Sequence, residues 1–154
     1  MADRTTLIEK LNTVLSWELA GIIQNLNHAM MVTGRERLTF ADFFSDNSKE
    51  NRSHAEAVGN RIAALGGVPT VEPARIKQAA SLDAMLEAAL ELEEAAMAAW
   101  LEALDAAEGA HLQTKLWIEE MVAEEQEHID ELMKITGRIS FAGLQLPGAS
   151  TKAG

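Results

Sequence analysis

The sequence contains no cysteine among its 154 residues. Disulfide bonds, thiolate metal sites and cysteine nucleophiles are therefore excluded, and any bound metal must use oxygen and nitrogen ligands. Tyrosine is also absent, proline occurs only 3 times, and aromatic residues make up 5% of the chain. The abundant residues are alanine, leucine, glutamate and methionine, so the composition favours helix over sheet.

Positive charge is scarce as well. Lys and Arg number 13 against 24 Asp and Glu, which gives a net charge of -11. Such a surface repels nucleic acid and anionic membranes and attracts cations, so we expect no DNA partner. No apolar run reaches the length of a membrane span, and residues 1–4 do not begin a signal peptide. We therefore expect a cytoplasmic protein with no membrane partner.

Four amphipathic segments separated by short breaks predict four α-helices. They cover residues 5–34, 38–67, 81–109 and 110–135, with Thr5 or Thr6 and Ser81 as predicted N-caps and Gly34 and Gly137 as stops. No segment reads as a strand. We expect residues 1–137 to form one bundle and residues 138–154 to form a short irregular tail.

The connection between the second and third helices is the only long one. Residues 68–80 can span about 43 Å when extended, and a helix of this size is about 40 Å long. The other two connections are short, so the helices they join are antiparallel neighbours. One long crossover in an all-α four-helix bundle is the ferritin-like arrangement.

Each predicted helix carries a residue of metal-ligating type inside its apolar stripe, near the middle of its length. The stripe of the fourth helix, spaced by 3 and 4, contains Ile118, Met121, Glu125, His128, Leu132 and Ile135. Glu18, His54 and Glu93 hold the matching positions in the first three helices. Buried carboxylates need a compensating charge, and no Lys or Arg lies among them. The pattern therefore predicts a metal centre, and carboxylate with imidazole suits iron or manganese and tolerates zinc.

These residues resemble the bacterioferritin class of ferritin-like proteins. Glu18, Glu93 and the pair Glu125-x-x-His128 look like four of its six metal ligands, and residues 54–56 and 61–69 are similar to its second helix and the exit from that helix. The resemblance covers roughly residues 5–135. It implies a di-iron ferroxidase and iron-storage protein that oxidises Fe(II) with oxygen or hydrogen peroxide inside a homo-oligomeric shell.

The resemblance also implies a role for each catalytic residue. Glu18 and His54 would hold one of two irons per subunit, Glu93 and His128 would hold the other, and Glu125 would bridge the two.

Three features depart from the family pattern. The bridging Glu expected three residues before His54 is replaced by Asn51, and Glu50 precedes it, so both are candidate metal ligands. Arg52 replaces the haem-ligating Met, so we expect no haem. The missing fifth helix favours a 12-subunit shell of Dps type over a 24-subunit shell. However, Glu56 and Asn60 do not match the intersubunit metal site of Dps proteins.

Asn51 leaves a second function open, a ferritin-like metal-binding protein with weak or no ferroxidase activity. His28 and Asn25 lie near the first stripe, and we expect them to form polar contacts between subunits. The three tryptophans are expected to be packing residues. An acidic cluster is read as a solvated face, with the lining of an inner cavity as its alternative; its members are Glu87, Glu91, Glu94 and Glu102.

Overall fold

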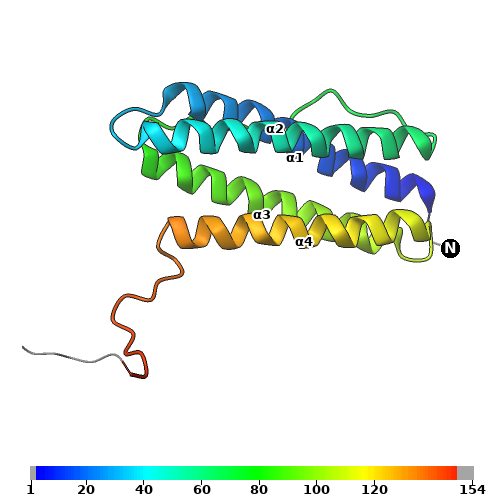
Figure 1. The fold of residues 1–154 in the computed structure, drawn as a ribbon. Helices are drawn as coiled ribbons and strands as arrows, with labels where there is room; N and C mark the ends of the chain where they lie inside the picture. The colour runs from blue at the N-terminus through cyan, green and yellow to red at the C-terminus, as the bar shows by residue number, and fades with distance from the viewer. Residues whose placement is uncertain (1–2, 149–154) are drawn as a thin grey trace, which may run out of the picture.

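The computed structural model describes residues 3–148, which contain four α-helices and no strand (Figure 1). The helices are α1 (Arg4–Met31), α2 (Arg37–Ala64), α3 (Leu82–Ala107) and α4 (Leu112–Ile135). The predicted all-α four-helix bundle is confirmed. No helix in the described part of the chain is long and apolar enough to span a membrane.

The helix ends differ from the predicted ones by a few residues. Asp3, and not Thr5 or Thr6, caps α1, because its carboxylate accepts the Thr5 N–H at 2.9 Å. Ser81 caps α3 as predicted. The His111 ring caps α4 by accepting the Thr114 N–H at 3.2 Å, which delays the start of this helix to Leu112. Histidine is not among the favoured capping residues, so the sequence gives little warning of this cap.

Residues 65–81 form the long crossover and lie along α1. Four hydrogen bonds fix this segment to α1: Asn12 to Val68, Thr70 to Asn12, Ala74 to Ser16, and Lys77 to Gln24. The crossover therefore carries the chain from one end of the bundle to the other, as its length predicts.

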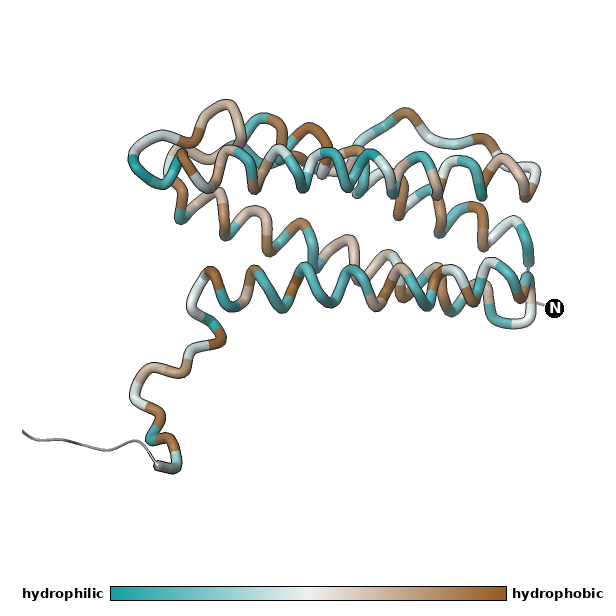
Figure 2. The backbone as a smooth tube through the Cα atoms, viewed as in Figure 1, coloured by the Kyte–Doolittle hydropathy of each residue, from teal (hydrophilic) through white to brown (hydrophobic). Residues whose placement is uncertain are grey.

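The apolar core is divided into two clusters, one toward each end of the bundle. One cluster is built around Trp100, Leu11 and Ile118, and the other around Phe44 and Leu132. Apolar positions recur along all four helices, with polar positions between them (Figure 2). Buried polar side chains occupy the middle of the helices, and they form the candidate site described below.

The chain leaves α4 at Ile135 and continues without a helix to residue 148, away from the bundle (Figure 1). Arg138 anchors the start of this segment through a 2.5 Å ion pair with Glu87 of α3. The predicted tail covers residues 138–154, and its last six residues lie outside the described part of the chain.

Candidate metal centre

Five side chains from all four helices meet at the middle of the bundle. Ligand atoms of Glu18, His54 and Glu125 lie within 4.8 Å of one another, and so do ligand atoms of Glu93, Glu125 and His128. Glu125 belongs to both groups. The structure thus brings together the five residues that the sequence singles out as catalytic, in two groups that share one carboxylate.

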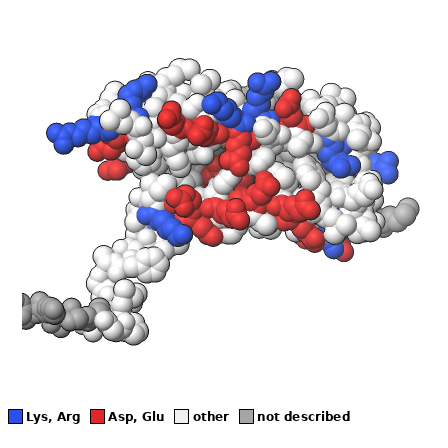
Figure 3. All heavy atoms as spheres, in the orientation of Figure 1, with Lys and Arg blue, Asp and Glu red and all other residues white. Residues whose placement is uncertain are grey.

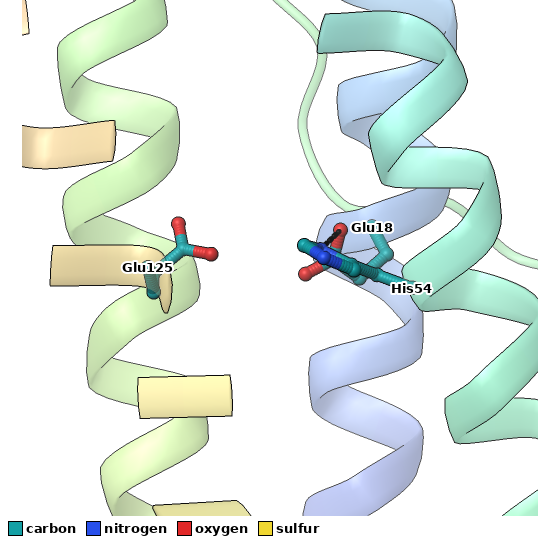
Figure 4. A group of neighbouring side chains, drawn as sticks. All are labelled: Glu18, His54 and Glu125. Atoms are coloured by element: carbon teal, nitrogen blue, oxygen red, sulfur yellow. Dashed lines mark ion pairs between the residues drawn. The ribbon is translucent and has the colours of Figure 1, made fainter. Parts of the chain in front are cut away.

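The first group holds three buried atoms that have no hydrogen-bond partner. Glu18 and His54 lie side by side and face Glu125 across the bundle (Figure 4), with 3.6 Å between His54 Nδ1 and Glu18 Oε2. Glu18 is 1% exposed and Glu125 is 2% exposed. The unpaired atoms are Glu18 Oε1, His54 Nδ1 and Glu125 Oε1. Each costs about 1–3 kcal/mol when left unsatisfied, and a cation between them would satisfy all three.

The second group contains a pair of carboxyl groups that hold a proton. Burial, together with the hydrogen bond and negative charge of Glu93, raises the pKa of Glu125 to about 12. Burial also raises the pKa of Glu93. Two carboxyls can be hydrogen-bonded to each other only when one is protonated. A metal ion that binds between them must therefore displace this proton.

The neighbours of His54 favour the charged form of its ring. Burial lowers the pKa of its imidazole, but the nearby negative charges of Glu18, Glu50 and Glu124 outweigh this effect and raise the pKa overall. The ring is thus surrounded by negative charge, which would also attract a metal cation bound beside it.

Glu50 and Asn51, the two candidates for the missing bridging ligand, lie in different places. The Glu50 carboxylate is 43% exposed, and its Oε1 is 3.0 Å from His128 Nε2. It belongs to neither ligand group. Asn51 is 8% exposed, and its Nδ2 donates to Glu18 Oε2 at 2.9 Å.

The direction of the Asn51 amide follows from its partners. An ionised carboxylate only accepts hydrogen bonds, so Asn51 turns its NH₂ group toward Glu18. Its oxygen then accepts from Asn25 Nδ2 at 2.9 Å. In this orientation Asn51 presents a donor, and not a ligand oxygen, to Glu18.

Gly21 of α1 leaves the space that the Asn51 amide occupies. A Cβ atom at residue 21 would lie 2.6 Å from the amide carbon of Asn51, which is closer than real Cβ contacts. We expect Gly21→Ala to push Asn51 away from Glu18 and Asn25 and to lower the free energy of unfolding by about 1–3 kcal/mol. Urea unfolding of the metal-free protein measures this.

Gly59 of α2 is the matched control for that substitution. Its added Cβ would meet only Pro69 Cβ, at 3.9 Å. Gly59→Ala should therefore stabilise the protein by about 0.5–1 kcal/mol, because alanine favours a helix interior. If both alanine variants are stabilised alike, Gly21 is not needed for the Asn51 contact.

Asn25 and His28 are not contacts between subunits, and that prediction is wrong. Both are buried inside a single chain, at 1% and 0% exposure. His28 packs edge-on against Phe44, with 5.2 Å between the ring centroids. A polar residue on the core stripe can face either the core or another chain, and the stripe alone does not distinguish the two.

Other residues singled out by the sequence lie at a distance from the two ligand groups. Trp100 is fully buried and packs edge-on against Trp117, as expected of packing residues. The acidic cluster of α3 is largely ion-paired at the surface; the pairs are Glu87 with Arg138, Glu91 with Lys77, and Glu102 with Lys10. Figure 3 shows a second gathering of acidic side chains where α2 and α4 face each other.

Four helices that turn carboxylates and histidines inward at mid-height define the class of bundle proteins that build metal sites in their cores. The model of the ferritin-like domain matches residues 8–142 of this chain. The chain therefore belongs to the ferritin-like family.

Known relatives and a solved structure support this assignment. Over 137 residues the chain is 31% identical to a bacterioferritin of Brucella melitensis biotype 1, covering 86% of this chain and 83% of the relative. It is 32% identical over 99 residues to a bacterial ferritin of Pseudomonas aeruginosa strain PAO1, a match that spans 64% of each protein. A Bacillus anthracis structure described as ferritin-like, diiron-carboxylate proteins superimposes with a TM-score of 0.83, at 31% identity over 87% of this chain and 97% of that one.

Proposed function

We propose that this protein is a di-iron ferroxidase that also stores or detoxifies iron. The observation that carries the proposal is a group of three ligand residues from three helices, each with a buried unpaired atom that a cation would satisfy. The names of the related proteins support iron as that cation, since two are ferritins and one is a diiron-carboxylate protein. The absence of cysteine is consistent with oxygen and nitrogen ligands.

The two ligand groups suggest how two Fe(II) ions would be held as substrates. Glu18 and His54 would hold one ion, Glu93 and His128 the other, and Glu125 would bridge them. Each Fe(II) gives one electron to oxygen or hydrogen peroxide. The buried carboxylates stabilise Fe(III) more than Fe(II), because the more highly charged ion interacts more strongly with them. The proton held by Glu93 and Glu125 is released when the ions bind.

A small cavity beside the second group is the route that we propose for the incoming ions. Its volume is about 50 Å³, and it opens beside Glu93 and His128. Asn47 and Glu131 line it together with Phe43 and Leu132. A carboxylate and an amide in its lining favour the passage of a cation.

A homo-oligomeric shell completes the proposal, with 12 subunits favoured over 24 and the cytoplasm as its location. Neither haem nor DNA has a place in this proposal, and Arg52 lies exposed on α2. Helix α1 exposes a row of apolar side chains that suits contact with a second copy: Ile23, Leu26 and Met30. The mass of the native protein in solution tests the shell.

Oxidation of Fe(II) tests the enzymatic part. The metal-free protein should bind about two iron ions per chain and oxidise Fe(II) faster than the protein-free buffer, followed by the absorbance of the ferric product. Glu93→Ala is the control, because it removes one buried carboxylate of the second ligand group and leaves the surface unchanged. It should oxidise Fe(II) more slowly than the unsubstituted protein. A rate no higher than that of the buffer would rule out a ferroxidase.

Asn51 favours a second candidate, a ferritin-like metal-binding protein with weak or no ferroxidase activity. Its amide donates to Glu18 and carries no charge. The first group therefore offers less negative charge to an oxidised ion than it would with a glutamate at residue 51. Under this alternative the protein binds metal ions in the same ratio but does not accelerate Fe(II) oxidation. Metal analysis together with the oxidation assay distinguishes the two functions.

A further inference from the structure

Two exposed carboxylates contact the two site histidines from the opposite helix. Glu50 of α2 reaches His128 of α4, with 3.0 Å between Oε1 and Nε2. Glu124 of α4 approaches His54 of α2, with 3.4 Å between Oε2 and Nε2. Each helix thus supplies one histidine to the site and one carboxylate to the histidine of the other helix.

The two nitrogens of His54 face opposite partners. Nδ1 faces inward toward Glu18 and has no hydrogen-bond partner, while Nε2 faces outward toward Glu124. A carboxylate beside Nε2 favours the proton on that nitrogen, which leaves the lone pair on Nδ1, the nitrogen turned toward the ligand group. The His128 ring stacks on the His54 ring, with 6.3 Å between centroids and 16° between planes.

These two contacts connect helices that are not closely packed against each other. The closely packed helix pairs are α1 with α2, α1 with α3, and α3 with α4. Helices α2 and α4 are not among them, so backbone packing constrains the site least on this side. The Glu50–His128 and Glu124–His54 contacts cross between these two helices at the height of the site.

We propose that Glu50 and Glu124 are positioning residues that orient His128 and His54 for metal binding. The proposal rests on the proposed metal centre. It assigns Glu50 to the histidine ring, and so Glu50 is not the replacement for a bridging metal ligand. Glu124 takes the equivalent place for the other metal position.

Titration with Co(II) tests this without any enzymatic turnover. Co(II) reports its ligand geometry through its visible absorption, and it favours the same nitrogen and oxygen ligands. We expect Glu50→Gln and Glu124→Gln each to weaken binding by about tenfold and to change the absorption spectrum. Glu120→Gln is the matched control, because Glu120 is exposed one turn before Glu124 on α4. It should bind Co(II) as the unsubstituted protein does.

A double-mutant cycle separates positioning from direct ligation. In a His128→Ala background, Glu50→Gln should have no further effect, while Glu124→Gln should keep its full effect. In a His54→Ala background, Glu124→Gln should have no further effect, while Glu50→Gln should keep its full effect. Thermal unfolding of the metal-free variants checks that each variant folds.

Three outcomes would overturn the inference. If Glu50→Gln still weakens binding in the His128→Ala background, Glu50 acts directly on the metal. If Glu120→Gln weakens binding equally, the effect is general electrostatics. If Co(II) binds normally to Glu50→Gln and Glu124→Gln, neither residue positions a ligand. Failure of the unsubstituted protein to bind Co(II) would instead overturn the metal centre itself.

Discussion

Glu125→Gln should abolish tight metal binding and, at the same time, stabilise the metal-free protein. Glu125 is the only carboxylate shared by the two ligand groups, so both of the proposed metal positions lose a ligand. The metal-free protein, however, holds this carboxyl at a pKa of about 12, because the site is buried and Glu93 is beside it. A neutral amide removes the cost of keeping that group protonated. We expect Co(II) affinity to fall at least about a hundredfold and the free energy of unfolding to rise by about 2 kcal/mol at pH 7.

Calorimetric titration and urea unfolding, both started from chelator-treated protein, measure the two effects. Glu127→Gln is the matched control, because it removes an exposed carboxylate two residues along α4. It should change the free energy of unfolding by less than about 0.5 kcal/mol. If metal-free Glu125→Gln is less stable than the unsubstituted protein, Glu125 stabilises the fold. In that case the buried carboxyl does not lower the stability of the metal-free protein.

The same pair of carboxyls predicts how the stability of the metal-free protein depends on pH. The pKa of Glu125 is higher in the folded state than in the unfolded state, so folding takes up a proton. Its stabilising contribution is complete below the ordinary carboxyl pKa and is lost steadily as pH rises toward the folded pKa. The raised pKa of His54 acts in the same direction, since its contribution is complete below its unfolded pKa and is lost above it.

The metal-free protein should therefore lose stability between about pH 5 and pH 8, at about 1.4 kcal/mol per pH unit from Glu125 alone. Urea unfolding at several pH values measures the slope. Glu125→Gln should show a clearly smaller slope than the unsubstituted protein. Equal slopes would show that the protonated carboxyl is not the source.

Much of the centre could be predicted because helical periodicity fixes which side chains face inward. Glu18, Glu93 and Glu125 interrupt apolar stripes, and a carboxylate inside such a stripe stands out at once. Their positions at mid-helix, joined with short connections and one long crossover, placed them at one height. The structure brings ligand atoms of these residues into two groups within 4.8 Å.

The contacts around the centre could not be predicted in the same way. Glu50 lies beside the stripe of α2, and its approach to His128 depends on side-chain rotamers and on the distance between α2 and α4. The residue pattern of a single helix does not predict the distance between two helices. Asn25 does lie on the stripe, but periodicity does not specify that it donates to Asn51. The orientation of the Asn51 amide follows only when both of its partners are known.

Asn51→Glu should produce the second large effect, with opposite signs in the metal-free and metal-bound protein. Two Fe(II) ions carry four positive charges, and the centre offers three carboxylates, from Glu18, Glu93 and Glu125. A fourth carboxylate on α2, beside Glu18, would balance the charge and would favour the oxidised ions further. We expect Fe(II) oxidation to accelerate about tenfold or more.

The metal-free form of the same variant should be less stable, because a fourth buried carboxyl replaces a neutral amide that has two hydrogen-bond partners. We expect a loss of about 1–3 kcal/mol in urea unfolding, recovered when metal is added. Asn51→Gln is the matched control: it has the length of Glu without the charge, so it should not accelerate oxidation. Acceleration by Gln as well would assign the effect to removal of the Glu18 hydrogen bond. No acceleration by Glu would show that Asn51 does not limit the activity of this centre.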